Sequence, residues 1–155
     1  MTYFPPVAFM WQRLAPLAMA VAVALALAST LPAAADESFE PLSGVAVEDA
    51  SIVAARVGDT ARLTMRIDNA SGRKITLLGV RAEIADSGAL IVAPPGVAKQ
   101  EAQSFVLMDQ ETLDLASSHI GAELRGLRRP IHPGETVEFE LIFAVGAVKA
   151  IAHAH

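Results

Sequence analysis

The chain has 155 residues, no cysteine, a formal net charge of −5 and a hydrophobic fraction of 53%. The acidic balance disfavours a nucleic-acid partner, because binding a phosphate backbone requires an excess of cations. Without cysteine, disulfides and thiolate metal ligands are excluded, so an apolar core must stabilise the fold.

Residues 1–35 have the three parts of an export signal. Arg13 is the only charged residue among them, and residues 14–28 form an apolar run rich in alanine and leucine. After Ser-Thr-Leu-Pro, the small residues Ala33 to Ala35 match a signal-peptidase site. The sequence therefore predicts a signal peptide that is cleaved after Ala35.

The alternative to cleavage is a retained membrane anchor. A membrane-spanning helix needs about 20 apolar residues, whereas the run at 14–28 is shorter and is followed by the cleavage site. The predicted signal contains neither a twin-arginine pair nor a cysteine that could carry a lipid. We therefore expect a periplasmic protein with no stable membrane anchor after cleavage.

The remaining chain is predicted to consist of an acidic linker at 36–44 and one domain at 45–155, close to the common domain size. Trp11 and Tyr3 both lie in the predicted signal peptide, so phenylalanine is the only aromatic residue type after it. Stacking platforms for bases or sugars are therefore not expected. We expect the domain to be a monomer.

Short apolar or alternating runs follow one another through the domain, separated by turn residues, and this rhythm predicts an all-β sandwich or barrel of about seven to nine strands. Residues 63–67 and 136–143 show the alternation that places one side of a strand in a core. The segment 97–103 is ambiguous. The predicted strands are 45–55 (one strand or two short ones), 63–67, 74–84, 89–92, 105–108, 112–115, 124–127, 136–143 and 147–152, with 105–108 and 112–115 forming a hairpin.

Two stretches resemble the periplasmic copper chaperones of the PCuAC type. Residues 63–80 (LTMRIDNASGRKITLLGV) are similar to that family's strand, N-x-G turn and following L-x-G-V strand. Residues 126–143 (GLRRPIHPGETVEFELIF) are similar to its G-L-K-x-P-L-x-x-G-D-x-V segment and the long apolar strand after it. The resemblance implies a cupredoxin-like Greek-key β-sandwich or barrel over the whole domain.

The resemblance also implies a Cu(I) site. In that family a histidine follows an early strand, a methionine comes about ten residues later, and an H-x-M pair precedes the G-L-K block, since imidazole and thioether suit Cu(I). Here the early strand ends at Val92 without a histidine, and the loop at 93–104 contains no methionine. His119 is present, but the residue two positions later is Gly121, where the family's H-x-M pair has methionine.

The histidines are the remaining candidate metal ligands, because imidazole is the commonest protein ligand for metals. We take His119, His153 and His155 as the candidate site, since His153 and His155 would project to the same side of an extended chain and clamp one ion. Copper, as Cu(I) or Cu(II), is the expected metal, and an exposed pair would favour Cu(II), Ni(II) or Zn(II). The alternatives are a loop position for His119 and a frayed tail for the pair. His132 is expected to be an exposed turn residue.

Met65 and Met108 are predicted to pack in the core. The acidic residues near the predicted hairpin turn, Asp109, Glu111 and Asp114, are predicted to form a solvated face. The sequence has no G-x-S-x-G or H-E-x-x-H motif, no phosphate-binding glycine loop and no cysteine nucleophile, so an enzyme is not expected.

Two functional hypotheses follow from the sequence. The first is a copper-chaperone-like protein that binds a metal ion and delivers it to a periplasmic or membrane protein. The second is a non-metal accessory module that retained the scaffold and binds a partner protein through a sheet edge or a loop.

Overall fold

The computed structural model describes residues 42–155, and the predicted signal peptide lies outside them. The described residues form ten strands, which is more than the sequence predicted, and contain no helix that could span a membrane. The strands are β1 (Val45–Ile52), β2 (Ala61–Asn69), β3 (Ile75–Arg81), β4 (Ala85–Val92), β5 (Gln100–Ala102), β6 (Phe105–Leu107), β7 (Glu111–Asp114), β8 (Ile120–Leu127), β9 (Thr136–Phe143) and β10 (Gly146–Ala154).

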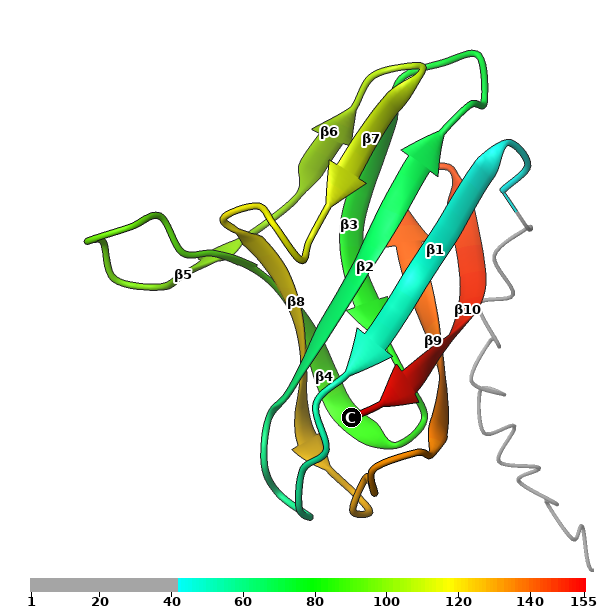
Figure 1. Cartoon of the computed structure of the whole chain (residues 1–155). Helices are drawn as coiled ribbons and strands as arrows, with labels where there is room; N and C mark the ends of the chain where they lie inside the picture. Colours follow the sequence, from blue (N-terminus) through cyan, green and yellow to red (C-terminus); the bar gives the residue numbers. More distant parts are fainter. Residues whose placement is uncertain (1–41) are drawn as a thin grey trace, which may run out of the picture. The chain divides into compact units, whose positions relative to one another are not determined.

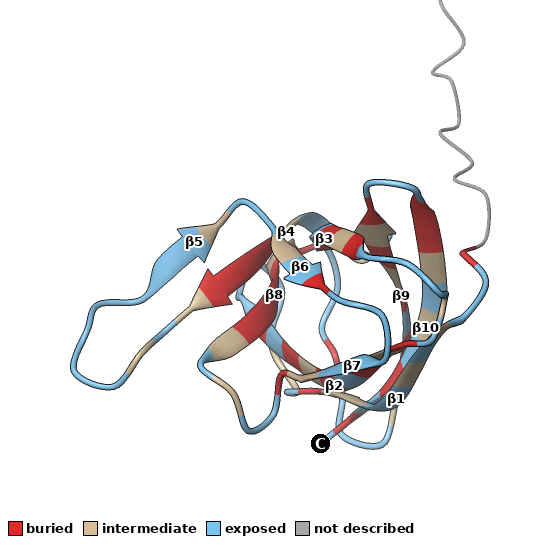
Figure 2. Ribbon diagram, turned by 90° about the horizontal axis from the view of Figure 1, so that it is seen from above, coloured by how far each residue is buried: buried red, intermediate tan, exposed pale blue. Residues whose placement is uncertain are grey.

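The ten strands form one sheet that curls into a barrel (Figure 1). Hydrogen-bonded neighbours follow the order β5-β4-β8-β2-β1-β10-β9-β3-β6, and β7 pairs with β2 outside that path. The pair β1 and β10 is parallel, and the other pairs are antiparallel. Figure 2 shows that buried residues alternate with exposed ones along the strands of the ring and that the β4–β5 hairpin projects away from it. The all-β prediction is confirmed.

Alternation in the sequence decides which side chains enter the core. On β2 the apolar residues Leu63, Met65 and Ile67 are buried, while the polar residues between them lie outward. On β9 the same pattern buries Val137 and Phe139 together with the apolar residues that follow at every second position. Successive side chains of a strand point to opposite faces of a sheet, so both predicted strands and the buried position of Met65 are confirmed.

The predicted hairpin of 105–108 with 112–115 is wrong. β6 pairs with β3, and β7 pairs with β2. The turn between them is attached to buried Asn69, whose side-chain amide donates to the carbonyl oxygens of Leu107 and Met108 at 3.3 and 2.8 Å. The chain therefore crosses from one part of the barrel to another at this turn. Met108 begins the turn and is 57% exposed, so its predicted burial is also wrong.

Several strand limits differ from the prediction because turns and pairing partners decide them. The apolar run at 74–84 ends as a strand at Arg81, since the N–H of Ala85 donates to the carbonyl of Ala82 and closes a turn. β4 begins directly after that turn. β8 begins at Ile120, earlier than predicted, because it pairs along its whole length with β4. β5 lies within the segment that is ambiguous in sequence.

Gly88 lies where β3 and β4 approach each other and the barrel closes. A Cβ atom at Gly88 would lie 1.9 Å from the backbone carbonyl oxygen of Val80. A contact this short with backbone cannot be relieved by moving a side chain, so closure at this point requires glycine.

β10 carries the end of the chain into the sheet. It pairs with β9 along its length and with β1 at Ser51 and Ile52. Leu42, within the predicted linker, is buried and donates its N–H to the carbonyl of Ala147 at 3.1 Å. The boundaries of the predicted signal peptide and linker stay predictions.

Candidate functional site

One end of the barrel brings together the segments to which the family resemblance assigns metal ligands. Val92, the last residue of β4, lies opposite Ile120, the first residue of β8. The N–H of Ala93 donates to the carbonyl of His119 at 2.7 Å. Lys99, in the loop between β4 and β5, lines the same small pocket as Ala93 and His119. The fold therefore brings the end of β4, the β4–β5 loop and the start of β8 close enough to share one site.

The side chains at this end include ion-paired cations and carboxylates. The ammonium of Lys99 lies 2.6 Å from a carboxylate oxygen of Glu123, which is only 9% exposed and lies 3.5 Å from Arg125. Arg125 also contacts Glu101 at 2.7 Å, and this hydrogen bond raises the pKa of Arg125 above its ordinary value. Cu(I) favours soft donors such as thiolate and thioether, together with imidazole. Of the side chains lining this described pocket, only His119 is such a donor, so the residues do not fit Cu(I).

Arg62 extends into the same pocket from β2. It lies directly opposite Glu123 in the β2–β8 ladder. Its guanidinium lies over Gly121, with the Nε atom 3.9 Å from the place of a Cβ atom on that glycine. Within residues 42–155 the guanidinium of Arg62 has no hydrogen bond or ion pair. In the described part of the chain, the pocket therefore contains a cation without a counter-ion.

The three histidines of the predicted site do not converge. His119 precedes β8, whereas His153 lies on β10, and β1 and β2 run between these strands. Three strand spacings amount to roughly 14 Å along the sheet. Among the described residues, no group of three or more histidine or acidic side chains is placed to hold a metal ion. His119 is therefore separate from the pair formed by His153 and His155.

The pair on β10 has a fixed backbone. His153 lies between Ser51 of β1 and Thr136 of β9. The N–H of His155 donates to the carbonyl of Ile52 at 3.1 Å, and its own carbonyl accepts from Ala54 at 2.9 Å. Both histidines are exposed, while the alanines before each of them are buried. The two imidazoles therefore leave the same outer face of a paired strand, and the tail is not frayed.

His132 is exposed in a turn, as predicted from its place before Pro133. Its backbone N–H donates to the Glu135 carboxylate at 3.1 Å. This bond, assisted by a hydrogen bond from Arg129, lowers the pKa of Glu135 below its usual value. The turn is thus fixed by backbone and carboxylate contacts, and the imidazole of His132 is a single exposed ring.

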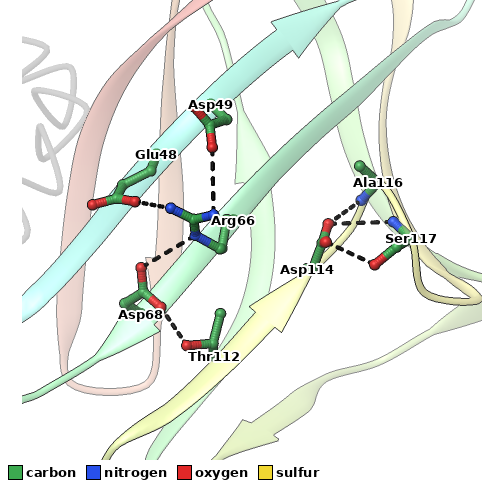
Figure 3. Close-up of polar contacts among 8 residues, drawn as sticks. All are labelled: Glu48, Asp49, Arg66, Asp68, Thr112, Asp114, Ala116 and Ser117. Atoms are coloured by element: carbon green, nitrogen blue, oxygen red, sulfur yellow. Dashed lines mark hydrogen bonds and ion pairs between the residues drawn. The ribbon is translucent and has the colours of Figure 1, made fainter.

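A second group of charges surrounds Arg66 of β2 (Figure 3). Its guanidinium contacts Glu48, and lies 3.6 Å from Asp49 and 3.7 Å from Asp68. The hydrogen bond to Glu48 raises the pKa of Arg66 above its ordinary value. Because the guanidinium occupies the space between the carboxylates, this group is a surface ion-pair network, which adds little stability at an exposed position.

Asp114 belongs to the acidic residues predicted to form a solvated face, and it also organises the turn after β7 (Figure 3). Its carboxylate accepts hydrogen bonds from the hydroxyl of Ser117 at 2.7 Å and from the N–H of Ala116 at 2.8 Å. These bonds favour the charged form, so they lower the pKa of Asp114, the Ser117 hydroxyl having the largest effect.

A family model described as "Putative lipoprotein LpqE-like" matches residues 45–152. The chain belongs to the LpqE-like family. LpqE-like proteins are of the PCuAC type, so the resemblance seen in the sequence is confirmed. No curated protein matches the sequence.

Solved structures agree with the LpqE-like assignment in fold. A copper-bound PCuAC domain from PmoF2 is 20% identical with a TM-score of 0.63, covering 76% of this chain and 97% of that one. The apo PCuAC domain from PmoF1 is 21% identical with a TM-score of 0.63, covering 76% and 98%. The solution structure of Cu(I)-DR1885 from Deinococcus radiodurans is 23% identical with a TM-score of 0.56, covering 77% and 82%. The cupredoxin-like fold class is confirmed.

Sequence reasoning missed Arg62, Lys99 and Glu123 of this LpqE-like chain. The available signal was the alternation of His119, Gly121 and Glu123, which share one face if β8 begins before residue 124. Lys99 lies in a segment without clear periodicity, and nothing local places it against Glu123. Only the pairing of β4 with β8 reveals that contact.

Proposed function

We propose that this LpqE-like protein acts outside the cytoplasm as a copper-binding protein that holds the metal at His153 and His155. The observation that carries the proposal is an exposed, strand-anchored pair of histidines at positions i and i+2. Such residues are separated by about 7 Å along a strand, and two imidazoles can meet at one ion through bonds of about 2 Å. Cu(II) is the divalent ion that imidazole sites bind most strongly.

A copper function also agrees with the relatives in fold, one of which is a copper-bound PCuAC domain. Two imidazoles leave further coordination positions of the ion open to water or to a donor from another protein. An open site of this kind suits transfer of copper to a periplasmic or membrane acceptor, which is the role we propose for the pair.

The test is titration of the purified protein with Cu(II) and Cu(I) against a competing chelator. We expect one Cu(II) ion per chain and at least about a tenfold loss of affinity in His153→Ala and in His155→Ala, because one imidazole cannot chelate. His119→Ala and His132→Ala are matched controls, since each removes a single exposed ring. Equal losses in all four variants would overturn the pair as the site.

A second function is favoured by the ion pair of Lys99 with Glu123 at the place where the resemblance implies Cu(I) ligands. In this alternative the chain is a non-metal accessory module that binds a partner protein. The same titration separates the two functions, because an accessory module would show no stoichiometric binding of either copper ion.

Export and cleavage are tested by the absorbance and the mass of the exported protein. Trp11 and Tyr3 both precede the predicted cleavage after Ala35. The exported protein should therefore scarcely absorb at 280 nm, and its mass should correspond to residues 36–155. Ordinary tryptophan absorbance in the exported product would contradict cleavage.

A further inference from the structure

The pocket at the end of β4 and β8 takes no part in the proposed copper function, and both its charge and its size suit a ligand of another kind. It is about 60 Å³ in volume and is lined by side chains from β2, β8 and the β4–β5 loop. Roughly 10–15 Å³ of such volume holds one water molecule. The pocket therefore has room for a few waters, which is comparable to a carboxylate group or a small tetrahedral anion.

The balance of charge around the pocket is positive. Three cations, Arg62, Lys99 and Arg125, face two carboxylates, Glu101 and Glu123. Glu123 is already engaged by Lys99 and Arg125, and Glu101 by Arg125. Both carboxylates therefore have their counter-ions, and the charge that is left over resides on Arg62.

The position of Arg62 makes that charge available. A residue directly across an antiparallel ladder has its Cβ about 5 Å away, so Arg62 could have turned toward Glu123. Its guanidinium instead lies over Gly121, whose missing side chain leaves the space free. A guanidinium presents parallel N–H donors that match the two oxygens of a carboxylate or phosphate. The ammonium of Lys99 keeps further donors beyond the one used by Glu123.

We propose that this pocket binds a small oxyanion, a carboxylate or a phosphate, through the guanidinium of Arg62 and the ammonium of Lys99. The pocket shares no residue with the pair on β10, and β1 lies between Arg62 on β2 and the histidines on β10. Because they share no ligand residue, the anion site and the copper pair can each exist without the other.

The test is titration of the isotope-labelled protein with sodium acetate and with inorganic phosphate at low ionic strength, followed by NMR at the Arg62 Nε–H and the Gly121 amide. We expect saturable shifts with a dissociation constant on the order of millimolar for at least one anion, since exposed charge pairs are weak. Acetate as the better ligand would indicate a carboxylate source, and phosphate would indicate a tetrahedral oxyanion.

Arg62→Gln is the decisive variant, because it retains an exposed polar side chain and removes the charge. We expect binding at least about fivefold weaker, as charge-assisted hydrogen bonds are lost. Arg56→Gln, in the loop between β1 and β2, is the matched control and should bind as the unmodified protein does. His153→Ala should also leave anion binding unchanged. Shifts that do not saturate, or equal effects of Arg62→Gln and Arg56→Gln, would overturn the site.

Discussion

The β4–β8 end of the barrel and the β10 strand differ in which part of a metal site each provides. At the β4–β8 end, three segments far apart in sequence converge, but the pocket contains Lys99 and Arg62. On β10, His153 and His155 are the proposed ligands, and they come from one strand rather than from converging loops. The backbone scaffold and the set of candidate ligands are therefore separable, because buried alternating residues build the scaffold and exposed residues provide the candidate ligands.

The substitution with the largest expected effect is at Gly88, where β4 lies against the backbone of β3. Gly88→Ala would place a methyl group against the carbonyl of Val80. We expect a loss of about 3 kcal/mol in the free energy of unfolding, since overpacking against backbone cannot be relieved locally. Urea unfolding measures it. Gly79→Ala is the matched control, because nothing lies within 4 Å of its Cβ position, and equal losses in both variants would contradict the close approach.

A second prediction concerns the turn that carries the chain between β6 and β7. Asn69→Ala removes the amide donor to Arg73, Leu107 and Met108. We expect a loss of about 2 kcal/mol in the free energy of unfolding, because a buried side chain loses the hydrogen bonds that it makes to three carbonyl groups.

Ser71→Ala is the control for that substitution, as it removes the hydroxyl that donates to Asn69 at 2.7 Å and leaves the amide contacts intact. Ser71→Ala should lower the free energy of unfolding by clearly less than Asn69→Ala does. A neutral Asn69→Ala substitution would show that the turn does not depend on this side chain.

The third prediction asks whether changing residues alone can convert the β4–β8 end into a copper site. Lys99→Met combined with Gly121→Met would place two thioethers near His119. We expect Cu(I) affinity at this end to rise at least about tenfold, because two thioethers and an imidazole suit Cu(I). A chelator competition in the His153→Ala background measures it.

Lys99→Met alone is the control for this conversion, because it removes the ion pair with Glu123 and supplies only one thioether. An equal gain in the single and the double variant would contradict a ligand role for the thioether introduced by Gly121→Met.

The smallest expected effect is a pH dependence at the turn after β7. The pKa of Asp114 is lowered in the folded protein, chiefly by the Ser117 hydroxyl. Its contribution to stability is therefore present above the pKa of the unfolded chain and is lost as the pH falls through the folded value. Unfolding midpoints measured from neutral to acid pH should fall less steeply in Asp114→Asn. Parallel curves for the two proteins would refute this linkage, and Asp109→Asn serves as the exposed control.

Much of the scaffold could be predicted from sequence. Alternation at 63–67 and 136–143 identified two core strands, and the residue pattern at 63–80 and 126–143 identified the family. The hairpin of 105–108 with 112–115 failed because two neighbouring apolar runs resemble a hairpin whether or not they pair. Asn69, which lies 38 residues before Leu107, decides how that segment turns.

Local sequence patterns were enough to establish that the domain is all-β, that it resembles the PCuAC type, and that His153 and His155 share one side of a strand. These properties depend on neighbouring residues, whose spacing along a strand is fixed by backbone geometry. The arrangement of the strands in the barrel was needed to show that His119 lies apart from that pair, and that Lys99 contacts Glu123 in the pocket that Arg62 enters. Contacts between distant segments depend on strand order, and local sequence does not specify strand order.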